Sequence, residues 1–271
     1  MLQIHTKDNY GTITADNNIR LAFIGRDMVL RKDGSTLQRE DIINLMNTMP
    51  HDILFTEPEY RITALGIPRK DAEGKEIAPL LPKEYITRSI RLYNAEQTEE
   101  TVTRISRAKG LTEWLRNTKF CSCCGAPLTP HATQTAMECK QCGKIVFPRI
   151  EPCIIVLVRR GDEMLLARHA QRNQDIYACI AGFMETGETA EQAVKREIME
   201  ETGLTVKNIK YFGSQSWPFP AQMMIAFTAD YESGELKIQE SEIQHAAWFH
   251  KDECPATPQP GSIAYRLIHS F

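Results

Sequence analysis

The feature that most constrains the fold is a glycine-bounded acidic segment over residues 182–204. Thr189 is followed three residues later by Gln192, and this pair can form a capping box at the start of a helix. Gly203 suits the left-handed conformation that often ends a helix. The segment therefore predicts a glycine-led loop followed by a helix from about residue 190 to residue 202.

Three carboxylates share one face of this predicted helix. Glu197, Glu200 and Glu201 are three and four residues apart, so their side chains point the same way. Like charges at this spacing repel by about 0.2–0.5 kcal/mol per exposed pair, so a purely structural helix gains nothing from them. Their oxygens suit Mg²⁺ or Mn²⁺. For an isolated E-x-x-E-E pattern a solvated acidic face is the more common interpretation, and only the surrounding sequence decides between the two.

Two cysteine pairs predict a second metal site. Cys121 and Cys124 are separated by fourteen residues from Cys139 and Cys142, and two such pairs can place four thiolates around one tetrahedral ion. Four thiolates leave no open coordination position, so we expect one structural zinc per chain and catalysis elsewhere. Cys123 could replace Cys124 as a ligand, although the two-residue gap favours Cys124. A nucleic-acid-binding ribbon is less favoured, because the segment between the pairs has no aromatic residue for base stacking.

The rest of the chain reads as alternating strands and helices. Apolar runs predict strands at residues 21–24, 28–30, 153–158, 164–167, 223–230 and 236–238. Helical spacing begins near Thr98 and returns over residues 262–269. The segment from Pro68 to Pro82 lacks periodicity and is expected to be a loop.

Residues 182–204 match the pattern G-x5-E-x7-R-E-U-x-E-E-x-G-U at every fixed position, with U an aliphatic residue, and so resemble the Nudix box. The resemblance implies an α/β fold, the Nudix α/β/α sandwich with a mixed sheet between helices. We expect an N-terminal α+β, Nudix-like domain over 1–118, a four-cysteine zinc ribbon over 119–148 and a catalytic Nudix domain over 149–271.

The resemblance also implies roles for individual residues of the box. Two or three Mg²⁺ or Mn²⁺ ions would be held by the backbone carbonyl of Ala181 and the carboxylates of Glu197, Glu200, Glu201 and Glu242. One glutamate, with Glu200 as the candidate, would serve as the base towards the attacking water. Arg196 would orient a glutamate by a charge-assisted hydrogen bond. Gly182 would let the loop backbone approach the site, and Glu188 would stabilise the junction of loop and helix.

A second motif narrows the resemblance. The segment Ser214–Pro220 reads S-Q-S-W-P-F-P and closely resembles the S-Q-P-W-P-F-P segment of the NADH pyrophosphatases, also known as NAD-capped RNA hydrolases, with Ser216 in place of a proline. Such a loop could also merely pack on the core. By this resemblance the substrate-binding residues are Phe183, Phe147, Gln134, Ser214, Gln215, Trp217, Pro218, Phe219, Pro220 and Ala264. Phe183 would stack on nicotinamide at a homodimer interface. Gln134 and Phe147 stand where relatives have glutamate and tyrosine, so fine specificity is open.

The function implied is hydrolysis of the diphosphate of NADH or NAD⁺ to nicotinamide mononucleotide and AMP, and removal of NAD caps from RNA by cleavage of the same bond. The sequence does not rank these substrates. One alternative is a Nudix pyrophosphatase for another nucleoside diphosphate derivative, such as ADP-ribose. Another is a noncatalytic nucleotide-binding regulator, which is disfavoured because every box carboxylate is present.

Composition excludes other classes. The 271 residues carry a net charge of −3, so no global basic field favours nonspecific binding to nucleic acid. The first eighteen residues show no export or transit signal, and no stretch approaches the roughly 20 apolar residues that a membrane-spanning helix needs. We therefore expect a cytoplasmic enzyme with no membrane partner.

Overall fold

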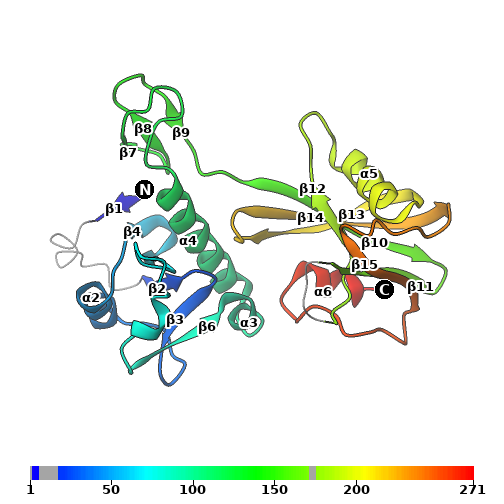
Figure 1. Ribbon diagram of the computed structural model, residues 1–271, viewed down its shortest axis with the longest axis horizontal. Helices are drawn as coiled ribbons and strands as arrows, with labels where there is room; N and C mark the ends of the chain where they lie inside the picture. The colour runs from blue at the N-terminus through cyan, green and yellow to red at the C-terminus, as the bar shows by residue number, and fades with distance from the viewer. Residues whose placement is uncertain (1, 6–17, 171–174) are drawn as a thin grey trace. The chain divides into compact units, whose positions relative to one another are not determined.

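The computed structural model describes residues 2–5, 18–170 and 175–271. The chain forms two compact units (Figure 1). The first unit comprises the chain up to Arg149 together with Pro218–Pro220, and the second comprises Ile150–Trp217 and Ala221–Phe271. Most of the N-terminal segment in which the sequence shows no export signal lies outside the described residues.

The first unit is built on a six-stranded mixed sheet with the order β1-β4-β5-β2-β3-β6. Its strands are β1 (Gln3–Ile4), β2 (Ile19–Ile24), β3 (Asp27–Arg31), β4 (Ile53–Glu57), β5 (Ile62–Ile67) and β6 (Tyr85–Ser89). Only β2 and β5 pair in parallel; the other pairings are antiparallel. The predicted strands at 21–24 and 28–30 are confirmed as parts of β2 and β3.

Helices cover both faces of this sheet. The helix α4 (Glu99–Asn117) begins at Thr98, whose hydroxyl accepts a hydrogen bond from the Thr101 amide, and it buries Ile105, Leu111 and Trp114 against one face. The helix α2 (Arg39–Thr48), which the sequence reading missed, buries Ile42, Leu45 and Met46 against the other face. The short helices are η1 (Pro58–Tyr60), η2 (Ala78–Leu80) and α3 (Ile90–Asn94), and η2 lies inside the segment predicted as a loop.

The four-cysteine segment belongs to the first unit. It forms a three-stranded sheet of β7 (Leu128–Pro130), β8 (Met137–Cys139) and β9 (Ile145–Val146). Cys121, Leu128 and Cys139 are members of the same buried cluster as Phe23 of β2. The ribbon therefore shares a hydrophobic core with the first sheet. The division of the chain at residues 118 and 148 stays a prediction.

The second unit is built on a mixed sheet with the order β13-β14-β10-β11-β15, and β12 also pairs with β10. Its strands are β10 (Glu151–Arg160), β11 (Glu163–His169), β12 (Ile180–Phe183), β13 (Thr205–Trp217), β14 (Gln222–Ser233) and β15 (Ile243–His250). The central strand β10 pairs in parallel with β14 and antiparallel with β11 and β12. Burial on both faces explains why residues 153–158 of this strand are continuously apolar.

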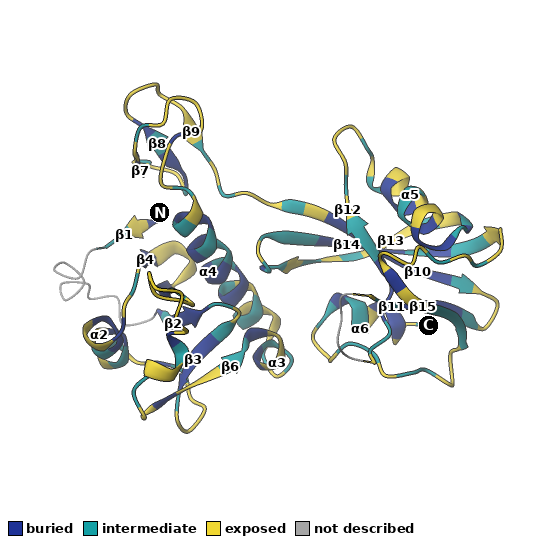
Figure 2. Cartoon of the chain, viewed as in Figure 1, coloured by how far each residue is buried: buried dark blue, intermediate teal, exposed yellow. Residues whose placement is uncertain are grey.

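Alternate residues of β10 enter two separate cores. Ile154 and Val156 pack in the cluster that includes Ile198 of α5 (Ala190–Thr202), whereas Ile155 packs in the cluster that includes Leu267 of α6 (Ile263–Ile268). In Figure 2 the buried residues follow the strands and one side of each helix. The second unit is thus a mixed sheet between helices, and the predicted α/β/α sandwich is confirmed.

One predicted strand is wrong. Residues 236–238 form no strand, and β14 continues to Ser233 instead of turning at residue 232. The amide of Lys237 donates to the carbonyl of Thr202 at 2.9 Å, and the amide of Gln239 donates to the carbonyl of Glu201 at 3.0 Å. The segment's backbone therefore satisfies the open carbonyls at the end of α5, which alternation of apolar residues could not predict.

Candidate active site and zinc site

The helix α5 begins and ends at the residues that the sequence signals predict. The Thr189 hydroxyl accepts from the Gln192 amide at 3.2 Å, and the Gln192 side chain accepts from the Thr189 amide at 2.8 Å. Gly203 ends the helix at φ 69°, a left-handed conformation that side chains other than glycine rarely adopt. These two ends fix which residues face the sheet and therefore where the acidic side chains lie.

The acidic residues of α5 are graded in burial. The side chain of Glu200 is 53% exposed, that of Glu197 is 12% exposed, and Glu201 as a residue is only 5% exposed. The Oε2 atom of Glu201 is buried and has no hydrogen-bond partner among the residues that the structure describes. A buried carboxylate oxygen without a partner is costly, so a solvated acidic face is not an adequate account of this helix.

The pKa of Glu201 also argues against a solvated acidic face on α5. Burial, followed by the charges of Glu197, Glu242 and Glu200, raises its pKa to about 8. Burial also raises the pKa of Glu197, against the lowering effect of Arg196. Carboxylates that destabilise one another's ionised forms would be relieved by a bound cation.

Arg196 organises the exposed side of this group. Its guanidinium donates to both carboxylate oxygens of Glu188 at 2.6 and 2.9 Å, to Glu197 at 2.8 Å and to Glu200 at 3.0 Å. It also donates to the backbone carbonyl of Phe183 at 2.9 Å. The bonds from Arg196 to Glu188, followed by one from the Glu185 amide, lower the pKa of Glu188 to about 2. One planar cation thereby joins the loop to two carboxylates of the helix.

Gly182 lies against the Glu197 carboxylate. A β-carbon built on Gly182 would lie 2.0 Å from both Cδ and Oε1 of Glu197. A side chain at residue 182 would therefore force the Glu197 carboxylate out of its present position. The glycine of the box thus allows β12 to lie directly against this carboxylate.

Glu242 comes from a segment that the end of α5 holds in place. Gln239 donates to the Glu201 carbonyl, and the amides of Glu242 and Ile243 donate to the Gln239 carbonyl at 3.0 and 2.8 Å. This turn explains why the charge of Glu242 raises the pKa of Glu201 although the two residues are far apart in sequence. The charges of Glu197, Glu200 and Glu242 therefore all act on Glu201.

The donor set fits hard divalent cations. It offers carboxylate oxygens, one of which is buried and has no hydrogen-bond partner among the described residues, and oxygen ligands of this kind are those that Mg²⁺ and Mn²⁺ accept. Cys153 was missed by the sequence reading as a neighbour of this group. Its thiol is buried, and burial followed by the charges of Glu197 and Glu201 raises its pKa to about 12. No motif marks this cysteine, because only its place on β10 puts it beside the carboxylates.

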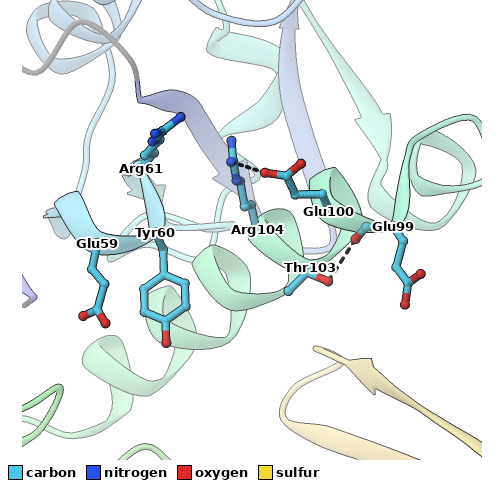
Figure 3. A pocket seen from close by; sticks show the side chains of 7 residues that line it. All are labelled: Glu59, Tyr60, Arg61, Glu99, Glu100, Thr103 and Arg104. Atoms are coloured by element: carbon cyan, nitrogen blue, oxygen red, sulfur yellow. Dashed lines mark hydrogen bonds and ion pairs between the residues drawn. The ribbon is translucent and has the colours of Figure 1, made fainter.

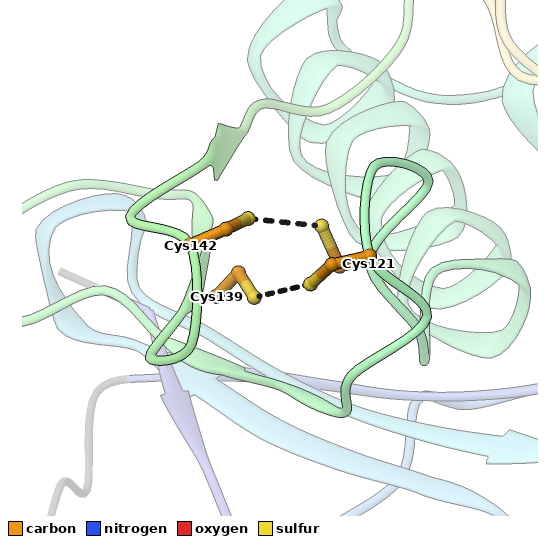
Figure 4. Close-up of side chains that lie close together, drawn as sticks. Cys121, Cys139 and Cys142 are labelled. Carbon is orange, nitrogen blue, oxygen red and sulfur yellow. Dashed lines mark hydrogen bonds between the residues drawn. The ribbon is translucent and has the colours of Figure 1, made fainter.

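The four cysteines of the ribbon converge on one point (Figure 4). The sulfur atoms of Cys121, Cys124, Cys139 and Cys142 all lie within 4.8 Å of one another. The Sγ atoms of Cys121 and Cys142 are 3.6 Å apart, and those of Cys124 and Cys139 are 3.5 Å apart. These distances are far longer than a disulfide bond and suit four thiolates around one zinc ion. Cys124 and not Cys123 belongs to the group, which decides the alternative that the sequence left open.

The predicted substrate residues fall into both units. In the second unit, Phe183 ends β12 with 50% of its surface exposed, Ser214 is exposed on β13, and Trp217 and Ala264 pack in the cluster around α6.

Gln215 has a structural role that its motif did not reveal. Its amide nitrogen donates to the Gly261 carbonyl at 2.8 Å, and its oxygen accepts from the Ile263 amide at 2.7 Å. It therefore fixes the start of α6, which carries Ala264.

The remaining predicted substrate residues lie in the first unit. These are Gln134, Phe147, Pro218, Phe219 and Pro220. Gln134 is exposed in the ribbon, and Phe147 is 55% exposed after β9. Phe219 lies beneath the guanidinium of Arg91, whose Cζ is 4.8 Å from the ring centre. Their contact with a substrate stays a prediction.

A cavity of about 530 Å³ opens in the first unit (Figure 3). It is lined by Glu59, Tyr60, Arg61, Glu99, Glu100, Thr103 and Arg104. Arg104 is already paired with Glu100. The cavity contains none of the carboxylates of α5 and has no gathered metal ligands, so it is not the candidate active site.

None of the helices that the structure describes combines the length and the apolar character needed to cross a membrane.

Comparison with known proteins agrees with the geometry of the second unit. Residues 149–269 match the family model described as NUDIX domain. The chain is 49% identical over 162 residues to the "NAD-capped RNA hydrolase NudC" of Salmonella paratyphi C, and 48% identical over 162 residues to the protein of the same name from Citrobacter koseri. Each match covers 60% of this chain and spans 63% of the relative's length.

A solved structure of a NUDIX hydrolase from Nitrosomonas europaea is 26% identical, covers 56% of this chain and 86% of that one, and has a TM-score of 0.44. The residues that match the NUDIX domain contain the carboxylates of α5, Arg196 and Glu242. Residues 149–269 of the chain therefore match a NUDIX domain.

Proposed function

We propose that this protein hydrolyses the diphosphate linkage of NADH or NAD⁺ to nicotinamide mononucleotide and AMP, and that it removes NAD caps from RNA by cleaving the same bond. The observation that carries the proposal is that the charges of Glu197, Glu200 and Glu242 act on Glu201, whose buried Oε2 atom has no hydrogen-bond partner among the residues that the structure describes. The names of the relatives, at 49% and 48% identity, support the choice of substrate.

The residues of the group divide the chemistry among them. Bound Mg²⁺ or Mn²⁺, two or three ions in our proposal, would neutralise the diphosphate and make water a better nucleophile. Glu197, Glu201, Glu242 and the Ala181 carbonyl would hold the cations. Glu200, the most exposed carboxylate of α5, takes the proton of the attacking water. Water adds to one phosphorus atom, the bridging P–O bond breaks, and the leaving phosphate carries away the bridging oxygen.

Arg196 acts by positioning. Its bonds to Glu188, Glu197 and Glu200 fix the directions of these carboxylates before substrate arrives. It does not need to touch the substrate, because its donor groups are already directed to the loop and the helix.

Recognition of the nicotinamide half is assigned to aromatic residues. Phe183, half exposed at the end of β12, offers a face on which a base can stack. Trp217 and Ala264 lie in the cluster around α6, and Gln215 supports them by fixing the start of that helix. We keep Gln134, Phe147, Ser214, Pro218, Phe219 and Pro220 as further substrate contacts.

The zinc of the ribbon is proposed to be structural, one ion per chain, because four thiolates leave no position for water. A homodimer, with Phe183 at the interface, and a cytoplasmic location remain proposals that rest on the sequence.

The test is a product analysis with purified protein, Mg²⁺ or Mn²⁺ and NADH. The proposal expects nicotinamide mononucleotide and AMP in equal amounts and no free nicotinamide. A Nudix enzyme for another substrate would instead prefer ADP-ribose, and a noncatalytic regulator would bind nucleotide without turnover. Preference for ADP-ribose would replace the proposed substrate, and binding without turnover would reject the proposed hydrolysis. The binding of divalent cations would be tested separately by calorimetry.

A further inference from the structure

We propose that Gly234 and Tyr231 are positioning residues for the proposed cation site, and that they act through Glu242. This inference rests on the proposed function, because it concerns the same site. It assigns a role to the turn that follows β14, which lies outside the Nudix box.

The turn after β14 lies directly against the end of α5. Gly234 follows the last residue of β14 with a φ of 103°, a conformation that side chains other than glycine rarely adopt. A β-carbon built on Gly234 would lie 2.7 Å from the backbone oxygen of Gly203 and 3.2 Å from the Cα atom of Leu204. Both atoms belong to the backbone, so a side chain at residue 234 would force one of the two chain segments to move away.

The contact is close from the other side as well. Gly203 ends α5, and a β-carbon built on it would lie 3.3 Å from the backbone oxygen of Glu235 and 3.4 Å from the Cβ atom of Lys237. Gly203 is a fixed position of the Nudix box. Gly234 is its counterpart outside the box, and together the two glycines allow the two backbones to approach each other.

This approach lets the backbone beyond the turn bond to α5. The amide of Lys237 donates to the Thr202 carbonyl at 2.9 Å, and the amide of Gln239 donates to the Glu201 carbonyl at 3.0 Å. Glu201 carries the buried carboxylate of the proposed site. The segment that begins at Gly234 is therefore bonded to the backbone of a proposed cation ligand.

The same segment ends at Glu242. The amides of Glu242 and Ile243 donate to the Gln239 carbonyl, and the Ala170 amide donates to the Glu242 carbonyl at 2.8 Å. The backbone of Glu242 is thus fixed by the segment on one side and by the residue after β11 on the other. The charge of Glu242 raises the pKa of Glu201, so the two carboxylates interact. A displacement of the segment at Gly234 would be passed along these bonds to Glu242.

Tyr231 fixes the turn from the side of β14. Its hydroxyl donates to the Gly234 carbonyl at 2.8 Å. Its ring makes an edge contact with Trp248 of β15, with centres 5.6 Å apart and planes at 82°. Packing therefore holds the ring, and the hydroxyl holds the peptide that follows Gly234. Phenylalanine at residue 231 would keep the ring and release the peptide.

A glycine elsewhere in the second unit separates positioning from simple turn formation. Gly161, between β10 and β11, also has a positive φ, of 62°, but a β-carbon built on it would have no atom within 4 Å. Gly161→Ala therefore introduces an unfavourable backbone conformation without a clash against α5. It is the matched control for Gly234→Ala.

The experiment measures the affinity of the zinc-loaded protein for Mn²⁺, from the electron paramagnetic resonance signal of the free ion. Gly234→Ala and Tyr231→Phe are each made in the wild type and in Glu242→Gln. The affinity compared is that of the site that Glu242→Gln weakens. Thermal unfolding is followed for every variant, and hydrolysis of NADH by the wild type is measured separately.

We expect Gly234→Ala to weaken Mn²⁺ binding by about 10- to 100-fold, as when the support of a metal ligand is lost. Tyr231→Phe should weaken it by about two- to five-fold, the scale of one hydrogen bond. Gly161→Ala should bind Mn²⁺ as the wild type does, even where it lowers the unfolding temperature. In Glu242→Gln neither substitution should weaken binding further, because the carboxylate that they position is gone.

An equal loss in Gly161→Ala, or a loss that persists in full in Glu242→Gln, would overturn the inference. Unchanged affinity in either variant would overturn the role of that residue, and Tyr231→Phe remains the test if Gly234→Ala does not fold. A wild type that binds Mn²⁺ without hydrolysing NADH would contradict the proposed function and leave the Mn²⁺ comparison valid. A wild type that binds no Mn²⁺ would overturn the cation site and this inference together.

Discussion

Replacing Glu201 with glutamine tests the candidate active site through stability as well as through activity. Glutamine keeps the shape of the side chain and is neutral at every pH. Turnover should fall by orders of magnitude because a metal ligand is lost. Stability should respond in the opposite direction, because in the metal-free protein the ionised Glu201 is buried beside the charges of Glu197, Glu242 and Glu200.

The magnitude follows from the pKa. A rise from 4.5 to about 8 corresponds to roughly 5 kcal/mol between the two protonation states. Because the pKa is higher in the folded protein than in the unfolded chain, the folded state binds the proton more tightly. The penalty is absent below the unfolded pKa of 4.5, grows as pH rises, and is complete above the folded pKa of about 8. A buried glutamine amide without partners costs about 1–3 kcal/mol at all pH values.

As pH is raised from 5 to 8, the free energy of unfolding of metal-free Glu201→Gln should therefore fall less than that of the metal-free wild type. The measurement is chemical denaturation followed by a spectroscopic probe in the second unit. Divalent cations should stabilise the wild type more than the variant. At pH 7, cation binding to the wild type should also release about one proton from Glu201, measurable by calorimetry in two buffers of different ionisation enthalpy. Parallel stability curves for both proteins, or near wild-type turnover in the variant, would refute the assignment.

Three other predictions address the zinc site, the nicotinamide contact and the arginine. Cys139→Ser should lower zinc content from about one per chain and destabilise the first unit more than it alters the chemistry, because Cys139 is buried in the same cluster as Phe23; a fully stable, zinc-free protein would contradict this. Phe183→Ala should weaken use of NADH by roughly 1–3 kcal/mol and use of ADP-ribose by less, so equal losses in kcat/KM for the two substrates would reject the stacking role. Arg196→Lys should lower kcat by about 10- to 100-fold with a smaller change in KM, because an ammonium group cannot hold Glu188, Glu197 and Glu200 together; unchanged kcat would show that these bonds do not position the group.

The elements that could be predicted from the sequence are those with local signals. The helix α5 has the predicted bounds because Thr189, Gln192 and Gly203 specify its ends through contacts within a few residues. The start of α4 near Thr98 was predicted from the helical spacing of the apolar residues that follow it. The metal ligands of the ribbon follow from spacing, although only the structure shows that Cys124 and not Cys123 is in the group.

The features that were missed depend on contacts between distant segments. The spacing of Glu197, Glu200 and Glu201 shows that they share a face, but the burial of Glu201 depends on what packs over that face. The segment at 236–238 looks like a strand until its amides meet the carbonyls at the end of α5. The motif around Gln215 gave no sign that its amide also bonds the backbone at the start of α6, and its contact with substrate stays a prediction.

Charge balance connects the burial of Glu201 to the number of cations. Five carboxylates, those of Glu188, Glu197, Glu200, Glu201 and Glu242, stand with one guanidinium, that of Arg196, so full ionisation leaves four negative charges. Protonation of Glu201, with its pKa of about 8, only reduces this excess. Two divalent cations would balance it, and a diphosphate, which brings two further negative charges, would leave room for a third. Without cations this group therefore keeps an excess of negative charge, and a bound diphosphate would increase that excess. Binding of the cations should for this reason favour binding of the substrate, and the reverse.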